Sequence, residues 1–376
     1  GGCLESSPGC FLPLHYNGKT TWIPGGAAPT AGTGIHFTGL PKLLELVLTN
    51  GVDKRTGIKV FEPHNRELKT LDDVWDVWMD YMTELCDISL KVNNIQMDIW
   101  RKNNPPVVAS LLKPDCFTKG QTLSNMGCRY NSTINFESCG TVTFINAMAS
   151  LKKNVFDEKK YTLDEMMDAL EHNFGFKTAF ETGVFSPDRR EATDEAVKYE
   201  KIFTDCVNAP KFGNADPYVD DLMVHYEDLM TALMPTLKSY YGKPLYMCQI
   251  SVSTHGSPTP SSASISTRAR RDCDGRLAGV TYADGSVSPA ANTDKNGIYA
   301  VFTSATCYDH SRNQNAQMNV KIHPSAVAGI NGTRKLLDVI RAYMRKGGFH
   351  VQFNITSSKT LREAQKKPDD YRDLMV

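Results

Sequence analysis

The chain has 376 residues and a mass of 41.8 kDa, which suits one large α/β unit or two to three average domains. Hydrophobic residues make up 41% and charged residues 22%, so we predict a buried core. Basic and acidic residues number 42 each, which excludes the basic excess that nucleic acids or anionic membranes attract. No apolar run reaches the roughly 20 residues that span a bilayer, and no signal peptide opens the chain, so we expect a cytoplasmic protein.

The ten cysteines are scattered without the spacing of a zinc site. In a large chain without an export signal, this pattern favours reduced thiols over a disulfide framework, and we expect no metal in this chain. The chain begins Gly1-Gly2-Cys3 without a methionine and stops abruptly at Val376. We therefore expect it to be a piece of a longer protein.

Two helices are predicted early in the chain, after glycine-rich turns. The first begins at Pro41 and ends at Gly51. The second is capped by Thr70 with Asp73 and continues to the two prolines at 105 and 106. At 1.5 Å per residue the second helix would be roughly 50 Å long, enough to cross the outside of a large domain.

Helical and strand patterns alternate in the rest of the chain. Thr162 with Glu165 forms a capping box, and an amphipathic stretch covers about 219–241. The period then changes to that of a buried strand over 245–253, followed by a polar, arginine-bearing loop over 263–271. A helix over 334–346, a stop at Gly347-Gly348 and a strand over 349–355 complete the pattern. This alternation predicts an α/β fold with helices outside the sheet.

The opening Gly1-Gly2-Cys3-Leu4-Glu5 is a candidate reactive loop. The chain lacks the HExxH, GxSxG and GxxxxGK[ST] motifs. Two glycines allow a tight turn that projects Cys3, and Glu5 falls on the same side of an extended segment. A thiol and a carboxyl in one site could accept a hydrogen atom and donate a proton. Spacing alone, however, favours a structural thiol and a surface acid.

Two further side chains are ambiguous from the sequence. His36 lies in an apolar stretch before the first helix, where a neutral core histidine is the common outcome. Glu137 lies between an aromatic residue and a cysteine, just ahead of a helical run. It either stabilises a helix N-terminus or is a polar group placed in a pocket.

The last hundred residues resemble the C-terminal region of glycyl radical enzymes, the relatives of pyruvate formate-lyase, glycerol dehydratase and the arylacetate decarboxylases. In that family Gly-Cys-x-Glu is the thiyl-radical loop, and it matches Gly2-Cys3-Leu4-Glu5. The two signals stand at opposite ends of the chain in the family's order, so the resemblance covers essentially the whole chain. The C-terminal segments that carry it are Asp274-Gly275-Arg276, Ala283-Asp284-Gly285, His323-Pro324-Ser325-Ala326, Gly347 to Asn354 and Tyr371-Arg372-Asp373-Leu374.

Within the family, the segments 5–11 and 135–137 look most like the 4-hydroxyphenylacetate decarboxylase branch. The dehydratase branch usually has a proline after the thiyl-loop glutamate, where this chain has Ser6. This resemblance implies a lyase that converts 4-hydroxyphenylacetate to p-cresol and carbon dioxide by radical decarboxylation. The alternatives are decarboxylation of indoleacetate or phenylacetate, dehydration of a diol, and an inactive fragment of such an enzyme.

The resemblance also implies a role for five residues. Cys3 would be the transient thiyl radical and would contact the substrate, and Glu5 would be its neighbouring proton donor. His36 and Glu137 would hold the phenol of the substrate, and Ile250 would be a pocket wall. The family's carboxylate-binding serine would lie upstream of Gly1.

The fold implied is the C-terminal part of a ten-stranded α/β barrel, made of two five-stranded half-barrels surrounded by helices. Residues 1–285 would belong to the barrel and 286–376 to a glycyl-radical domain that is truncated before the radical glycine. The family's Arg-Val-x-Gly motif would lie beyond Val376, so the fragment alone should be inactive. The implied cofactor is a glycyl radical that a radical SAM activating enzyme installs. The resemblance further implies a homo- or hetero-oligomer, with or without a small iron–sulfur subunit.

Overall fold

The computed structural model describes residues 37–54, 56–111, 114–127, 135–182, 191–242, 244–249, 274–280, 282–313, 316–367 and 369–371. Cys3, Glu5, His36 and Ile250 lie outside these residues, as does the predicted loop over 263–271.

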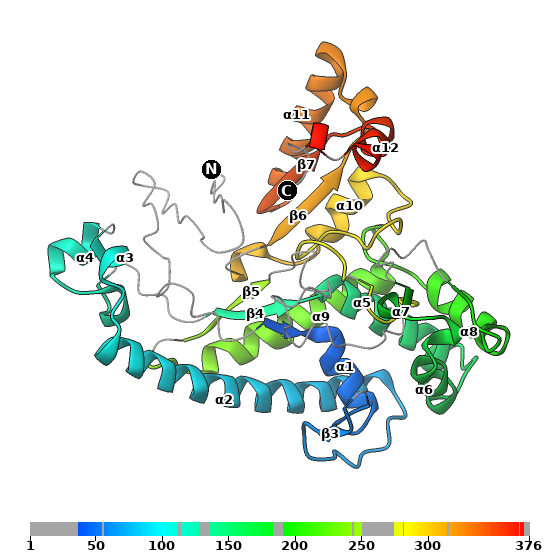
Figure 1. Ribbon diagram of the computed structural model, residues 1–376, viewed down its shortest axis with the longest axis horizontal. Coiled ribbons are helices and arrows are strands. Elements are labelled where there is room, and N and C mark those ends of the chain that lie inside the picture. The colour runs from blue at the N-terminus through cyan, green and yellow to red at the C-terminus, as the bar shows by residue number, and fades with distance from the viewer. Residues whose placement is uncertain are drawn as a thin grey trace.

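The body of the molecule is organised around a three-stranded parallel sheet in the order β1-β4-β5 (Figure 1). The strands are β1 (Phe37–Gly39), β4 (Asn135–Cys139) and β5 (Tyr246–Gln249). Parallel neighbours require crossover connections, and both crossovers here consist mainly of helices. The α/β arrangement predicted from the sequence is therefore present.

The crossover from β1 to β4 contains the two helices predicted early in the chain. Its elements are α1 (Leu40–Leu48), the antiparallel pair β2 (Val52–Asp53) and β3 (Ile58–Lys59), α2 (Leu71–Asn103), α3 (Val107–Leu111), α4 (Pro114–Lys119) and the 3₁₀ turn η1 (Leu123–Asn125). Gly51 follows α1 with a φ of +85°, and its N–H donates to the Leu46 carbonyl at 2.8 Å. At the start of α2, the hydroxyl of Thr70 accepts from the N–H of Asp73 in a capping box. Both helix predictions are confirmed.

The crossover from β4 to β5 also consists mainly of helices. Its elements are α5 (Thr141–Leu151), the π-helical turn η2 (Lys152–Asp157), α6 (Leu163–Glu171), η3 (Asn173–Gly175), α7 (Ala179–Thr182), α8 (Ala196–Asn208), α9 (Pro217–Leu233) and η4 (Met234–Thr236). The Thr162–Glu165 capping box is present at the start of α6. The amphipathic stretch expected to reach residue 241 is α-helical only as far as Leu233 and ends in the 3₁₀ turn η4, because Pro235 lacks an N–H to continue the α-helical ladder.

The core is packed with aromatic side chains where α2, α5 and α9 meet. Trp78 of α2 is fully buried and stacks on Phe144 of α5, with ring centroids 5.0 Å apart. Tyr226 of α9 is also fully buried and meets both rings edge-on at 5.9 Å. Because such large rings bury much apolar area, this cluster should contribute strongly to the stability of the body.

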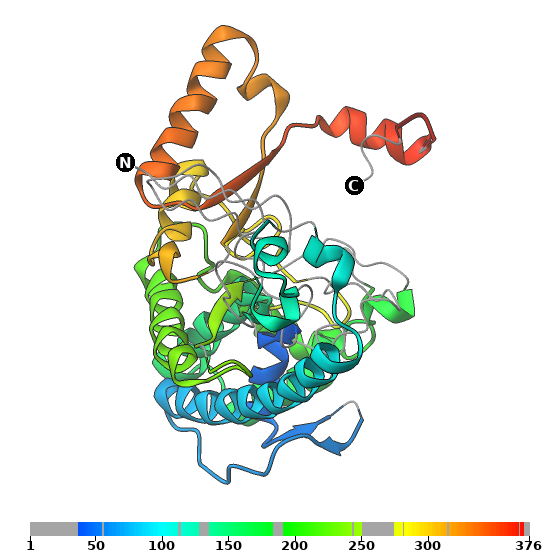
Figure 2. The ribbon, with the colours of Figure 1, turned by 90° about the vertical axis from the view of Figure 1, so that its left-hand side faces the viewer.

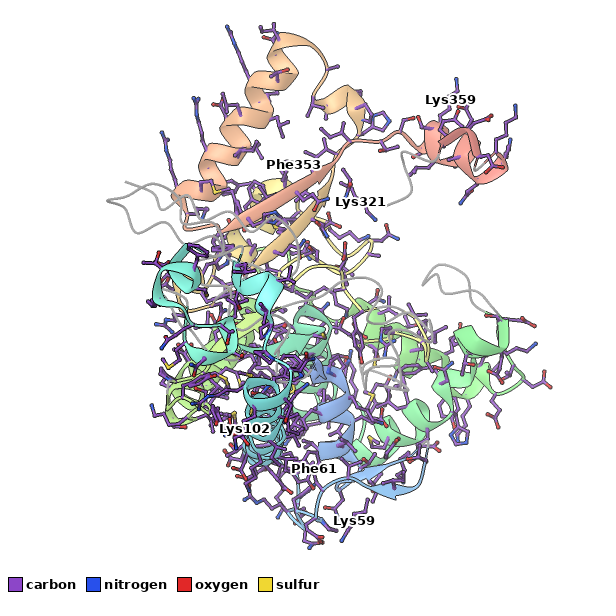
Figure 3. The ribbon with its side chains drawn as sticks, turned by 60° about the vertical axis from the view of Figure 1, so that its left-hand side comes forward. Lys59, Phe61, Lys102, Lys321, Phe353 and Lys359 are labelled. Carbon is purple, nitrogen blue, oxygen red and sulfur yellow. The ribbon has the colours of Figure 1, made fainter. Side chains whose placement is uncertain are left out.

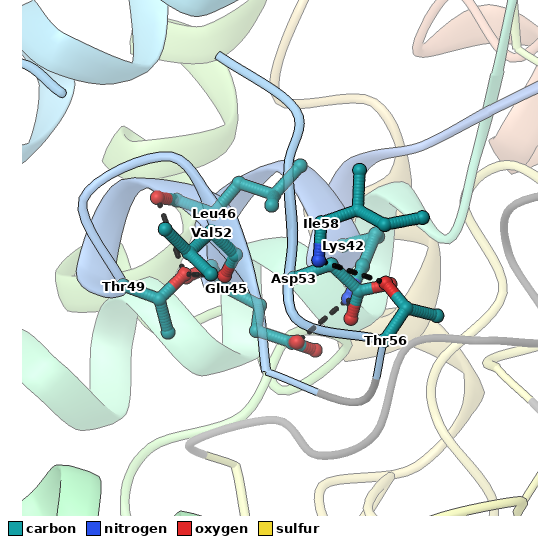
Figure 4. A network of polar contacts seen from close by, with 8 residues as sticks. All are labelled: Lys42, Glu45, Leu46, Thr49, Val52, Asp53, Thr56 and Ile58. Carbon is teal, nitrogen blue, oxygen red and sulfur yellow. Dashed lines mark hydrogen bonds and ion pairs between the residues drawn. The ribbon is translucent and has the colours of Figure 1, made fainter. Parts of the chain in front are cut away.

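A buried charge network fixes α1 to the β2–β3 pair (Figure 4). Lys42 is only 4% exposed, and its ammonium group donates to Glu45 Oε1 at 2.6 Å and to Asp53 Oδ1 at 2.9 Å. Thr56 donates to the other oxygen of Asp53. The buried cation is therefore fully paired, as a desolvated charge must be.

The C-terminal unit projects from the body (Figure 2). The chain reaches it through α10 (Ile298–Ala305) and η8 (His310–Arg312); its elements are β6 (Gln317–Lys321), η9 (Pro324–Ala326), α11 (Gly329–Arg345), β7 (His350–Asn354) and α12 (Ser358–Lys366). Strands β6 and β7 pair in parallel, and Figure 3 shows Lys321 and Phe353 on them. The helix stop is confirmed, because Gly347 has a φ of +96° and the Gly348 N–H donates to the Tyr343 carbonyl at 3.0 Å.

Among the described residues, no helix is both long enough and apolar enough to cross a bilayer. The cysteines at 86, 116, 139, 206 and 307, which lie within the described part, are free thiols.

Candidate active site

The central strand β4 carries Glu137 between the two outer strands. Its backbone lies level with Phe37 of β1 on one side and with Cys248 of β5 on the other. Neighbouring strands are about 4.8 Å apart, so these three positions form one row across the sheet. In the sequence, His36 directly precedes β1 and Ile250 directly follows β5. Three of the residues expected to contact substrate therefore belong to, or adjoin, the three strands of one sheet.

Glu137 lies in a strand and not in the first turn of a helix. Helix α5 begins at Thr141 and has no acidic residue in its first turn. The interpretation of Glu137 as a helix N-terminal stabiliser is therefore wrong. Its alternative role in a pocket stays a prediction, as do the roles of Cys3, Glu5, His36 and Ile250.

The junction between β4 and α5 requires a glycine. Gly140 has a φ of +74°. A Cβ atom there would lie 3.0 Å from the ring of Tyr282 and 3.1 Å from Cδ of Pro41. The missing side chain thus lets the strand turn at once into the helix while two other segments pack against the turn.

A buried carboxylate, which the sequence analysis missed, lies next to the sheet. Glu227 of α9 is fully buried, and its Oε2 accepts from the side-chain amide of Asn313 at 2.8 Å. The backbone of Asn313 in turn forms a parallel bridge with Met247 of β5. The pair therefore connects α9 to the segment that borders the outer strand of the sheet. A signal existed in the sequence, because Glu227 interrupts the apolar face that Met223, Tyr226 and Met230 form on α9.

The tyrosines around Glu227 are held in the neutral form. Burial raises the pKa of both Tyr226 and Tyr308 well above the usual value, and the nearby charge of Glu227 raises each further. Both phenols therefore keep their protons. The core around Glu227 therefore contains buried polar groups and is not purely apolar.

A second buried acid joins α9 to α10. The hydroxyl of Ser304 donates to Asp220 Oδ2 at 3.0 Å and accepts from the N–H of Ala215 at 2.9 Å. Burial raises the pKa of Asp220 to about 6, with smaller contributions from the charges of Asp216 and Asp221. Asp220 therefore titrates within the range of ordinary buffers.

Buried polar side chains also hold the irregular segment that leads into the C-terminal unit. Thr143 of α5 accepts from the N–H of Ala283 at 2.9 Å, and Asn173 of η3 accepts from the N–H of Ala278 at 2.8 Å. These contacts satisfy backbone groups that have no strand partner. They hold Ala278 and Ala283 against η3 and α5.

The Asp274-Gly275-Arg276 motif has a structural explanation in the described residues. The Arg276 N–H donates to Asp274 Oδ1 at 3.0 Å, and the Arg276 guanidinium lies 4.9 Å from the ring centroid of Tyr282. Lys211 nearby donates to the carbonyls of Cys206 and Ala209 at the end of α8. These contacts secure a turn and a helix end.

No cluster of three or more His, Cys, Asp or Glu side chains in the described part of the chain is arranged to hold a metal ion.

Two family models match the chain. The model described as pyruvate formate lyase-like matches residues 22–257, and the model described as glycine radical matches residues 283–376. Together they cover most of the sequence in the order that the sequence resemblance implied.

Two curated relatives align along nearly all of the chain. The 4-hydroxyphenylacetate decarboxylase glycyl radical subunit of Clostridium scatologenes is 64% identical over 376 residues, which is 100% of this chain and 41% of the relative. Indoleacetate decarboxylase of Tractidigestivibacter scatoligenes is 36% identical over 94% of this chain and 39% of its own length. The chain therefore spans about two fifths of the relatives it matches.

A solved structure supports the fold. The glycerol-bound B12-independent glycerol dehydratase of Clostridium butyricum superposes with a TM-score of 0.76 at 27% identity, over 97% of this chain and 42% of that one. The fold class expected from the sequence, part of an α/β barrel of the glycyl radical enzyme type, is confirmed.

Proposed function

Because the chain belongs to the pyruvate formate lyase-like family, we propose that it forms part of a glycyl radical enzyme that decarboxylates 4-hydroxyphenylacetate to p-cresol and carbon dioxide. The observation that carries this proposal is the 64% identity to the decarboxylase subunit along the whole chain. Identity falls to 36% against the indoleacetate enzyme and to 27% against the glycerol enzyme. Decarboxylation of other arylacetates is the second candidate, and diol dehydration the third.

The proposed chemistry assigns a step to each site residue. A stored glycyl radical would take the hydrogen atom of the Cys3 thiol and leave Cys3 as a thiyl radical. Cys3 accepts an electron from the substrate carboxylate, which leaves as carbon dioxide, while Glu137 accepts the phenolic proton. Glu5 then protonates the Cys3 thiolate, and the thiol returns a hydrogen atom to the benzylic carbon, which restores the thiyl radical. Glu137 gives its proton back to the phenolate oxygen, so the product is p-cresol.

Two residues position the substrate in this proposal. His36 orients the phenol against Glu137, and Ile250 closes one side of the pocket. The row of Phe37, Glu137 and Cys248 across the sheet supports it, because His36 and Ile250 adjoin the same strands in the sequence. A carboxylate in such a pocket needs a partner, and the phenol together with an imidazole can provide one.

The whole protein is proposed to be a cytoplasmic oligomer. Residues 1–285 would form part of the barrel, and residues 286–376 would form the beginning of the glycyl-radical domain. The two matched ranges, 22–257 and 283–376, support this division. We assign the radical to no glycine of the described residues. A radical SAM enzyme would install it, and a small iron–sulfur subunit is a candidate partner, since the similar protein of Clostridium scatologenes is named as a subunit.

The test is anaerobic product analysis on the activated full-length protein with 4-hydroxyphenylacetate, phenylacetate, indoleacetate and glycerol side by side. We expect p-cresol as the preferred product. Glu137→Gln should lower kcat and kcat/KM by about 10²–10⁴-fold, because it removes the base for the phenolic proton.

The matched control is Glu84→Gln, at an exposed position on α2, which should leave turnover unchanged. Phenylacetate should be a poor substrate because it leaves the Glu137 carboxylate without a partner. Preferred turnover of glycerol, or equal rates with phenylacetate and its hydroxylated form, would reject the proposal.

A further inference from the structure

Helix α2 carries one continuous apolar stripe along its length. The stripe residues follow one another at intervals of three or four, which places them on one face of the helix. They are Val74, Val77, Tyr81, Leu85, Ile88, Val92, Ile95 and Ile99.

Only the first half of this stripe is covered. Val74 and Val77 are fully buried, and Tyr81 is 4% exposed. Helix α1 packs on this half, and the ring of Phe61 stacks on Tyr81 at 4.4 Å. The cover consists of α1 and the segment from β2 to Phe61, and α1 and β3 lie near the N-terminal end of α2 in Figure 1.

The second half of the stripe is exposed although its residues are just as apolar. Ile88 and Val92 are each 48% exposed, Ile95 is 64% exposed and Ile99 is 51% exposed. The apolar surface continues beyond the helix at Val108 of α3, which is 76% exposed. Aligned isoleucine and valine side chains of this kind mark a surface that another element covers.

The C-terminal half of α2 is already attached to the body by its other side. Cys86, Leu90 and Met97 are buried there. At about 100° per residue these positions lie roughly opposite Ile88, Val92 and Ile95. A helix that is apolar on two opposite sides lies between two layers, and the described residues supply only one of them.

The N-terminal half of the same helix serves as an internal comparison. Its solvent-facing positions are acidic, with Asp72, Asp76 and Asp80 all exposed. Along the C-terminal half, Lys91 pairs with Asp87 and Lys102 with Asp98, so those charges neutralise one another within the helix. An apolar partner could therefore cover the stripe beside them without leaving an unpaired charge.

We propose that the exposed stripe Ile88–Val92–Ile95–Ile99 is the docking face for a helix of the remaining polypeptide of the full-length protein. The chain covers 41% of a relative that is 64% identical to it, so about three fifths of the relative's length has no counterpart in this chain and is available to cover the stripe. The three- and four-residue spacing suits ridges-into-grooves packing of a second helix at a shallow angle. This surface is independent of the proposed reaction.

The experiment compares two neighbouring cysteine variants of the full-length protein. Ile95→Cys lies on the stripe, and Gln96→Cys lies on the next, exposed position off it. Each is alkylated under native conditions, and the labelling rate of that peptide is followed by mass spectrometry, which separates it from the native cysteines. We expect Ile95→Cys to react at least tenfold more slowly than Gln96→Cys.

Two results would overturn the proposal. Equal labelling rates would mean that the stripe is free in the whole protein. Protection that disappears on dilution to single copies would mean that a second copy covers it. A second pair of variants gives an independent readout, because Ile95→Lys should lower the thermal unfolding midpoint and Gln96→Lys, which adds the same charge, should leave it unchanged.

Discussion

The body and the projecting C-terminal unit are built from similar elements but bury them to different degrees. In the body, α5 has every one of its residues buried. In the C-terminal unit, α11 buries only Gly332 and Tyr343, and α12 buries none of its residues. Local signals are nevertheless strong in the unit, where Ser357 caps α12 and Gly347-Gly348 ends α11. Caps and glycine stops therefore define helices in both regions, whereas burial provides most of the stability of the body only.

The largest expected difference between the regions comes from removing large apolar side chains. Trp78→Ala in the body should lower the free energy of unfolding by about 3–5 kcal/mol, because it empties a fully buried site stacked on Phe144. Leu361→Ala in the unit should change it by less than about 0.5 kcal/mol, since Leu361 is 51% exposed. Guanidinium unfolding of the full-length protein measures both, and equal effects would refute the contrast.

Adjacent residues of the segment beside β5 allow a sharper comparison. Asn313→Ala should cost about 2–3 kcal/mol, because it removes a donor from the fully buried carboxylate of Glu227. Arg312→Ala removes an exposed ion pair with Asp228 to the same helix and should cost less than about 1 kcal/mol. The same unfolding measurement applies. If Arg312→Ala lowered the free energy of unfolding more than Asn313→Ala, burial would not determine the strength of these contacts.

The buried acid Asp220 should make the stability of the body depend on pH. Its folded pKa of about 6 lies above the unfolded value, so the folded state binds the proton more tightly. The resulting stabilisation is full below about pH 4 and is lost as the pH rises through 6. Asp220→Asn should therefore be more stable than the parent above pH 6, by on the order of 2 kcal/mol, and the difference should fade toward pH 4.

Thermal unfolding midpoints between pH 4 and 8 test this prediction. Asp76→Asn, at an exposed position on α2, is the control and should follow the parent. A constant difference between Asp220→Asn and the parent across that range would show that Asp220 does not titrate as stated.

The smallest predicted contrast concerns two glycines with positive φ. Gly140→Ala should cost about 2 kcal/mol, because the left-handed backbone and the contacts with Tyr282 and Pro41 both oppose a side chain. At Gly347, whose Cβ position is open, alanine should cost only about 1 kcal/mol, from the left-handed backbone alone. Thermal unfolding measures both variants. Equal unfolding midpoints would show that close packing at the β4–α5 junction does not add to the cost at Gly140.

Sequence patterns located the helix ends where the responsible groups are neighbours in the chain. The capping boxes at Thr70 and Thr162 and the stop at Gly347 are examples, because each forms its contacts within a few residues. The end of α9 was placed too late, since periodicity continued past Pro235. The roles of Cys3, Glu5, His36 and Ile250 came from resemblance and stay predictions.

By itself, the sequence determined helices such as α1, α2, α6 and α11, the two capping boxes and the α/β class, because 3.6-residue periodicity and local hydrogen bonds are encoded over short distances. Helices α8, α10 and α12 were not predicted from it. Only the tertiary structure decided which strands are neighbours and that Glu137 lies in the middle strand and not at a helix N-terminus. It also decided that Asn313 donates a hydrogen bond to Glu227, 86 positions earlier in the chain. Tertiary packing also covers one half of the α2 stripe and leaves the other half exposed. Such pairings depend on long-range packing, in which a side chain's environment is set by residues that local patterns do not reach.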